Sequence, residues 1–186
     1  MAKKKMKTSK TAYLIIALIC LVLCEVLPIF TEKIPQFGTG LRPMHFPILI
    51  AGFACGPWLA LIVGATAPII SALIHGAPML IPTEIAMNFE LATYGVMVGI
   101  LYSQLPRKTG NIYVSLITAM IVGRIVWCAS MLVIAGRMQT QFTYHMFIAY
   151  AFVDAVPGIV VQIVLIPAIV IILEKANLTY RGRKYV

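Results

Sequence analysis

The chain has 186 residues, 61% of them hydrophobic and 11% charged, with a mean hydropathy of +0.94 and a formal net charge of +9. Soluble domains are about half apolar and about a quarter charged, so this composition excludes an ordinary soluble protein. The basic residues lie mostly in the short segments before, between and after the apolar runs, which argues against a nucleic-acid-binding surface. We therefore predict one integral membrane domain over residues 1–186, with a basic tail at 1–10 and a second tail at 174–186.

A membrane-spanning helix needs roughly 20 apolar residues. Five runs meet or approach this length, at 11–30, 57–75, 83–103, 111–135 and 144–173. The first run follows a lysine-rich tail, as a signal peptide would, but it is too long for a signal core and no Ala-x-Ala cleavage site follows it. We interpret it as a retained helix. The last run is about 45 Å long at ~1.5 Å per residue, so it must tilt or bend, at Pro157 or Pro167.

Residues 44–55 form a shorter apolar segment, which ends at Gly56-Pro57 with no polar spacer before the next run. Eleven of the fifteen basic residues lie at the N-terminus, in one internal loop and at the C-terminus: Lys3, Lys4, Lys5, Lys7, Lys10, Arg107, Lys108, Lys175, Arg181, Arg183 and Lys184. The positive-inside rule assigns these regions to the cytoplasm, so both termini share a side and the number of crossings is even. Counting 44–55 gives six. The expected fold is an all-α membrane bundle of six helices with a short second helix.

Polar side chains inside a bilayer are costly and usually face the interior of a bundle. In 83–103, Glu84 and Asn88 share one face, while Glu90 and Tyr94 share another that is roughly opposite, because two residues turn a helix by about 200°. Arg124 lies near the middle of 111–135. Most polar groups fall in the half of the bundle away from the cytoplasm, which indicates a ligand cavity that is open outside and closed inside.

The candidate substrate-binding residues share this placement, at the outer mouth of 44–55 or within the later helices. They are Arg42, His45, Glu84, Asn88, Glu90, Arg124, Trp127, Tyr150 and Asp154.

Several of these residues have a second interpretation. Arg124 either lines the cavity or pairs with Glu90 or Asp154 to hold helices together, and one role does not exclude the other. Trp127 and Tyr150 are either stacking platforms or core and interfacial anchors. The three histidines lie on different segments without metal-ligand spacing, so no metal site and no cofactor are expected.

Small residues recur on one face of 57–75, at Ala60, Gly64, Ala67 and Ser71. Such a face lets helices approach closely in lipid. It either packs against another helix of this chain, the first or the second, or forms a docking face for a second membrane protein. The sequence contains no GxSxG, HExxH or Walker motif, so no catalytic or nucleotide site is expected.

Two stretches carry a resemblance to a known family: HFPILIAGFACGPWLALIVGATAPIISAL (45–73) and AMNFELATYGVMVGILY (86–102). Together with the basic N-terminus and six helices in under 200 residues, they resemble the substrate-binding S components of energy-coupling factor (ECF) transporters. The resemblance implies a high-affinity vitamin binder in the plasma membrane that is not an enzyme. It also implies partners: a transmembrane coupling protein, docked through the first three helices, and two cytoplasmic ATPases.

The first helix departs from the family pattern. Its nearest match to the family's Ala-xxx-Ala is Tyr13-xxx-Ala17, so Ala17 joins the small face as an expected partner contact.

Two other functions compete with a binding subunit: a small intramembrane enzyme that acts on a lipid-linked substrate, and a stand-alone ion-coupled carrier. In the first, Glu90, Asp154 and a histidine would exchange protons with the substrate. The resembled family carries riboflavin, pantothenate, folates, cobalamin-type compounds and queuosine precursors. The choice among them stays open, because the sequence offers both carboxylates and an arginine.

Overall fold

A computed structural model describes residues 10–31, 42–75, 83–138 and 155–180. These residues form helices and no strand, and five of the helices are long and apolar enough to cross a membrane. The helices are α1 (Lys10–Thr31), α2 (His45–Cys55), α3 (Pro57–His75), α4 (Thr83–Gln104), α5 (Thr109–Met138) and α7 (Val156–Lys175). The expected all-α membrane fold is confirmed.

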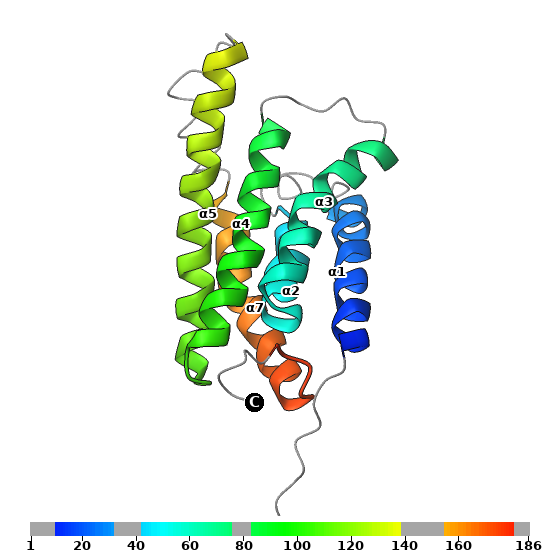
Figure 1. The fold of residues 1–186 in the computed structure, drawn as a ribbon, viewed down its shortest axis with the longest axis vertical. Helices are drawn as coiled ribbons and strands as arrows, with labels where there is room; N and C mark the ends of the chain where they lie inside the picture. The colour runs from blue at the N-terminus through cyan, green and yellow to red at the C-terminus, as the bar shows by residue number, and fades with distance from the viewer. Residues whose placement is uncertain (1–9, 32–41, 76–82, 139–154, 181–186) are drawn as a thin grey trace, which may run out of the picture.

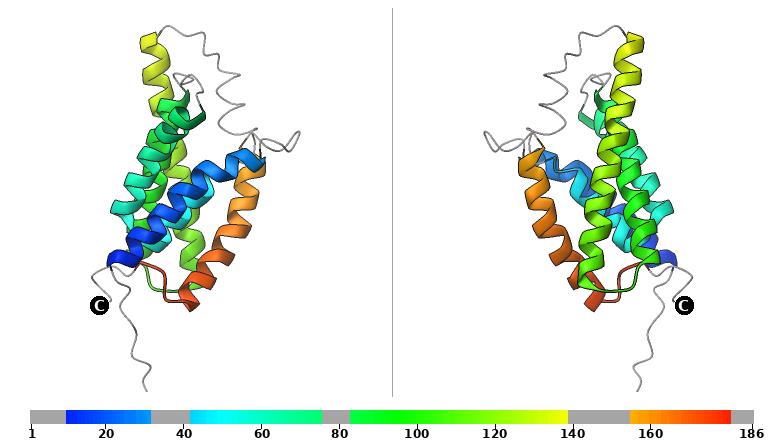
Figure 2. Two further views of the ribbon diagram at one scale, coloured as in Figure 1. Left: turned by 90° about the vertical axis from the view of Figure 1, so that its right-hand side faces the viewer. Right: turned by 90° about the vertical axis from the view of Figure 1, so that its left-hand side faces the viewer.

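Successive helices run in opposite directions, so that one end of the bundle gathers the start of α1, the α2–α3 and α4–α5 turns and the end of α7 (Figures 1 and 2). We call this the basic end, because Lys10, Arg107, Lys108 and Lys175 belong to these segments. The alternation agrees with the even number of crossings expected from the charges.

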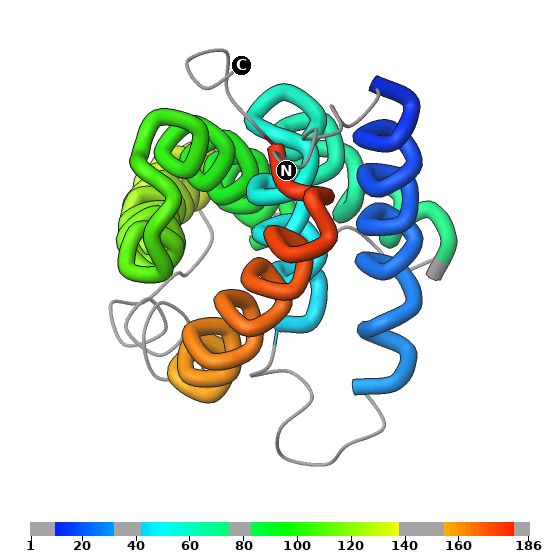
Figure 3. Tube along the Cα trace, turned by 90° about the horizontal axis from the view of Figure 1, so that it is seen from below, coloured from blue at the N-terminus to red at the C-terminus, as the bar shows by residue number. Residues whose placement is uncertain are grey.

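Helix α2 lies at the centre of the bundle, where it contacts α1, α3, α4 and α7 (Figure 3). Ten of its 11 residues are buried. At ~1.5 Å per residue it is about 16 Å long, roughly half of the hydrocarbon thickness. The short second helix is therefore confirmed, and it serves as the core around which the long helices pack.

Of the two prolines expected to bend the last run, one lies at the start of helix α7 and the other lies inside it. Pro157 lies in the first turn of α7, where the missing N–H has no helical partner to lose, so it marks a helix start. Pro167 lies inside the helix. Residues 144–154 of the expected run fall outside the described part of the chain.

The turn between α2 and α3 consists of one residue, Gly56, with φ of 84°. This left-handed region favours glycine, and a Cβ here would lie 2.7 Å from the ring of Tyr180. The Tyr180 backbone N–H in turn donates to the Phe53 carbonyl at 2.9 Å. Arg107 donates to the Thr179 hydroxyl at 2.7 Å and to the Tyr180 carbonyl at 2.9 Å. The segment after α7 is thereby fastened across the basic end.

The small face of α3 packs against α4 of the same chain. A Cβ at Gly64 would lie 2.5 Å from the Leu91 carbonyl oxygen, and one at Gly95 would lie 2.6 Å from the Ala60 carbonyl oxygen. Ala60 and Ala67 are fully buried. The alternative that this face packs inside the chain is thus realised. Ala60 clusters with Cys20 of α1 and Ala51 of α2, the expected neighbours, and α4 is a further neighbour that was not expected.

The two remaining expected partner contacts differ in exposure. Ala17 is 6% exposed, and Ser71 is partly buried. A buried side chain does not reach a second protein while the helices stay packed. What α1 and α3 present outward are large apolar side chains, among them Leu18, Trp58 and Leu73.

We expect Gly64→Ala to lower the free energy of unfolding by about 1–3 kcal/mol, because the added methyl meets backbone atoms of α4 that cannot move aside. Gly136→Ala on α5 is the matched control: its Cβ meets nothing within 4 Å, and replacing a helical glycine gains up to about 1 kcal/mol. Thermal unfolding in detergent measures both. Equal effects at the two positions would contradict the close contact of α3 with α4.

Candidate functional site

The site is built around one carboxylate. Glu90 on α4 is fully buried, and its Oε1 accepts a hydrogen bond from the Tyr94 hydroxyl at 2.8 Å. Arg124 of α5 brings Nη1 to 3.1 Å from the same oxygen. On the other side, Arg42 Nη1 and His45 Nε2 lie 3.8 and 3.9 Å from Oε2. We call these five residues the Glu90 cluster.

Local sequence explains how these groups meet. Glu90 and Tyr94 are four apart, one helical turn, so their side chains lie on the same face of α4. His45 is the first residue of α2, and Arg42 precedes it with φ of 45°, a conformation rare for non-glycine residues. Gly123 lets α5 approach, because a Cβ there would collide with the Tyr94 ring. The next residue on α5 is Arg124, which this approach brings to Glu90.

The charges of the cluster are concentrated and shielded from solvent. The side chains of Arg42 and Arg124 are 18% and 12% exposed, and both arginines are cations in proteins. Several buried atoms have no hydrogen-bond partner among the described residues: Glu90 Oε2, both ring nitrogens of His45 and Arg124 Nη1. Buried polar atoms are normally satisfied, so unsatisfied ones gathered in one place indicate a binding site.

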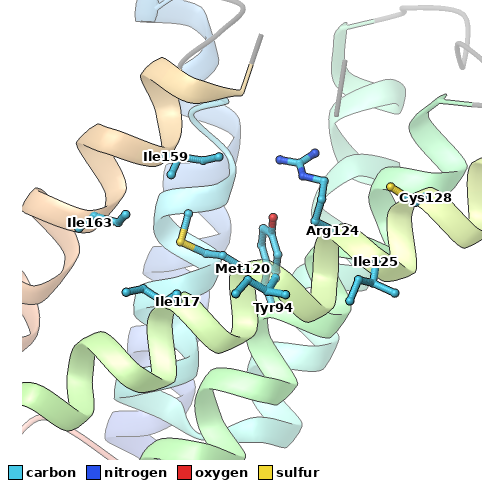
Figure 4. Close-up of a pocket in the computed structure, with 9 residues that line it drawn as sticks. Tyr94, Ile117, Met120, Arg124, Ile125, Cys128, Ile159 and Ile163 are labelled. Carbon is cyan, nitrogen blue, oxygen red and sulfur yellow. The ribbon is translucent and has the colours of Figure 1, made fainter. Parts of the chain in front are cut away.

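A cavity of about 410 Å³ adjoins the cluster between α4, α5 and α7. Arg124 and Tyr94 belong to the cluster and also line the cavity. In Figure 4 the Arg124 guanidinium and the Tyr94 hydroxyl point toward the same side of the cavity. The other lining residues are Ile117, Met120, Ile121, Ile125, Cys128, Ile159 and Ile163. The volume falls in the range of about 300–1,000 Å³ usual for small-ligand sites.

Four of the sequence-predicted site residues come together in this arrangement: Arg42, His45, Glu90 and Arg124. Of the two partners considered for Arg124, Glu90 is the one found at contact distance. Tyr150 and Asp154 lie outside the described residues, so their roles stay predictions.

Trp127 takes the core position that was one of its two interpretations. Its side chain is 1% exposed and packs with Ala86 and Met131. The Arg124 Cζ lies 5.8 Å from the centre of the Trp127 ring, within the range of a cation–π contact. Trp127 is not among the described residues that line the cavity, so a stacking role for it stays a prediction.

Glu84 and Asn88 lie apart from the Glu90 cluster. The Asn88 side-chain amide donates to the Glu84 backbone carbonyl at 3.3 Å. They share the α4 face of Leu91 and Gly95, which contacts α3 at Gly64 and Ala60. Beyond that point α3 bends away from α4 (Figure 1), and Pro68 inside the helix accounts for the bend.

Sequence reasoning missed the apolar wall and the cluster role of Tyr94. One signal was present, because Met120, Arg124 and Cys128 recur every four residues on α5 and so share a face with the charged residue. Tyr94 stood one turn from Glu90, but it was not taken as a site residue.

The family model of the ECF transporter substrate-specific component matches residues 7–173, most of the chain. No curated protein and no solved structure shows significant similarity to this chain.

We expect Glu90→Gln to cost about 3–5 kcal/mol of stability, because it removes the counter-charge from two largely buried arginines. Glu84→Gln is the control on the same helix, and it loses only a first-turn helix-dipole interaction of about 0.3–1 kcal/mol. The stabilities of the two variants are compared by their midpoints of thermal unfolding in detergent. A Glu84 variant as unstable as the Glu90 variant would refute the central role of Glu90.

Proposed function

The chain belongs to the family of substrate-specific components of ECF transporters, and from this premise we propose that it captures a vitamin or related micronutrient outside the cell and delivers it through a partner complex driven by ATP hydrolysis. The observation that carries the proposal is the Glu90 cluster at the edge of a 410 Å³ cavity. In an otherwise apolar bundle, such a concentration of buried polar atoms is typical of a ligand site.

The proposed orientation places the basic end of the bundle in the cytoplasm. It rests on the positive-inside rule, applied to Lys10, Arg107, Lys108 and Lys175. Both termini are then cytoplasmic, and the end of α2 at which Arg42 and His45 lie faces outward. Closure of the basic end by the segment after α7 suits a binding protein that takes its ligand from the opposite side.

The proposed partners are those with which the family works: a transmembrane coupling protein and two ATPases. The chain carries no Walker motif, so energy for uphill transport comes from elsewhere. Because the small residues of α3 are buried against α4, we propose that a coupling protein meets the large exposed side chains of α1 and α3 instead, such as Leu18 and Trp58.

A ligand should remain bound to the purified protein, and native mass spectrometry of the protein in mild detergent detects it as added mass. We expect Arg124→Gln to lose this ligand, because the variant removes the charged group that lines the cavity. Arg137→Gln, at the exposed end of the same helix, should retain it. Wild-type retention by Arg124→Gln would remove Arg124 from the site.

Uptake of the retained ligand should require the partner ATPases, because the chain has no nucleotide site of its own. Proteoliposomes that contain the chain alone, with an ion gradient, are expected to show binding without accumulation. Accumulation in these vesicles would identify a stand-alone carrier, and chemical conversion of the ligand would identify an enzyme.

A further inference from the structure

The charges around the cavity constrain the ligand, and this inference rests on the proposed function. We propose that the ligand is an amphipathic monocarboxylate: its carboxylate binds the Arg124 guanidinium, and its uncharged body occupies the apolar cavity between α5 and α7.

The first step concerns Glu90, whose carboxylate is already engaged. Its Oε1 accepts from Tyr94 and contacts Arg124, and its Oε2 faces Arg42 and His45. Glu90 is fully buried and does not belong to the residues that line the described cavity. A cationic group in the cavity would therefore meet the arginine before the carboxylate, which is unfavourable.

The second step is the balance of charge. Within the described cluster, two guanidiniums face one carboxylate, so the formal charge is at least +1 whichever form His45 takes. A buried unit charge is costly in a low-dielectric environment. With His45 neutral, one ligand carboxylate would bring the summed formal charge of these described groups to zero.

The third step is the availability of Arg124. A guanidinium has five N–H donors in a planar fork that matches a carboxylate. Arg124 lines the cavity, and its buried Nη1 makes no hydrogen bond to the described residues although it lies 3.1 Å from Glu90 Oε1. The centre of the Trp127 ring lies 5.8 Å from the Arg124 Cζ, within the range of a cation–π contact, so Trp127 can help to position the guanidinium.

The fourth step is the wall of the cavity. Apart from Tyr94 and Arg124, the described residues that line it are isoleucines, one methionine and one cysteine, such as Met120, Ile159 and Ile163. These side chains leave a hydroxyl-rich or multiply charged body without hydrogen-bond partners, at a cost of about 1–3 kcal/mol for each buried polar group. The wall therefore favours one charged end and an apolar remainder.

Matched acid and neutral forms of the same micronutrient test this assignment. Suitable pairs are lipoate with lipoamide, biotin with biotinamide and nicotinate with nicotinamide. Binding to the purified protein, freed of any co-purified ligand, is measured by isothermal titration calorimetry. We expect the acid of at least one pair to bind about tenfold or more tightly than its neutral form, as a charge-assisted hydrogen bond predicts.

Variants separate the charge effect from general damage. Arg124→Gln should abolish the preference for the acid, while Arg137→Gln should keep it. Arg124→Lys retains the charge without the planar fork and should keep part of the preference, which covers the case that Arg124→Gln does not fold.

The ligand retained by wild-type protein from cells gives a second, independent measurement. A retained ligand without a negative charge, or neutral forms that bind as tightly as every acid, would overturn the monocarboxylate assignment and leave the proposed function intact. If the protein retains no small molecule and binds neither these compounds nor the other candidate ligands, such as riboflavin and a folate, the proposed function fails together with the assignment.

Discussion

The structure depends on keeping a full negative charge inside an apolar bundle. Burial of an unpaired carboxylate costs several kcal/mol, so Glu90 requires positive partners from other segments. It finds them in Arg42 just before α2 and Arg124 on α5, while Tyr94 donates from its own helix. One ion cluster thus joins three parts of the chain that are distant in sequence. The same requirement fixes where α2 begins in the bundle and how α5 is rotated about its axis.

Close helix packing makes this arrangement possible. Helices associate in lipid without a strong hydrophobic driving force, so contact between backbones supplies much of the attraction. Gly64 and Gly95 let α3 meet α4 on one face, and Gly123 lets α5 approach Tyr94 on another. Helix α4 is therefore held from two sides, and Glu90 is placed by packing that involves no charge. The pattern of glycines sets the geometry that the ions then occupy.

Composition and the placement of lysine and arginine were sufficient to predict the helical fold and the short second helix, and the Gly56-Pro57 pair marked the turn between the second and third helices. The Arg124–Glu90 pair was among the pairings considered, because few charges exist inside the spans. The contact of the small face on α3 with α1 and α2 was expected, but its close approach to α4 was not, since such a pattern indicates close approach without naming every partner. The cavity wall was missed for a related reason: in helices that are apolar all round, an isoleucine that faces a ligand looks like one that faces lipid.

Helix α2 has neither end free. At one end His45 lies against Glu90, and at the other Phe53 accepts a hydrogen bond from Tyr180, whose ring covers Gly56. These attachments are separated by only about three turns of helix. A shift of α2 along its axis by even one residue would break contacts at both ends at once. The segment that follows α7 and the buried charges are therefore linked through one short helix.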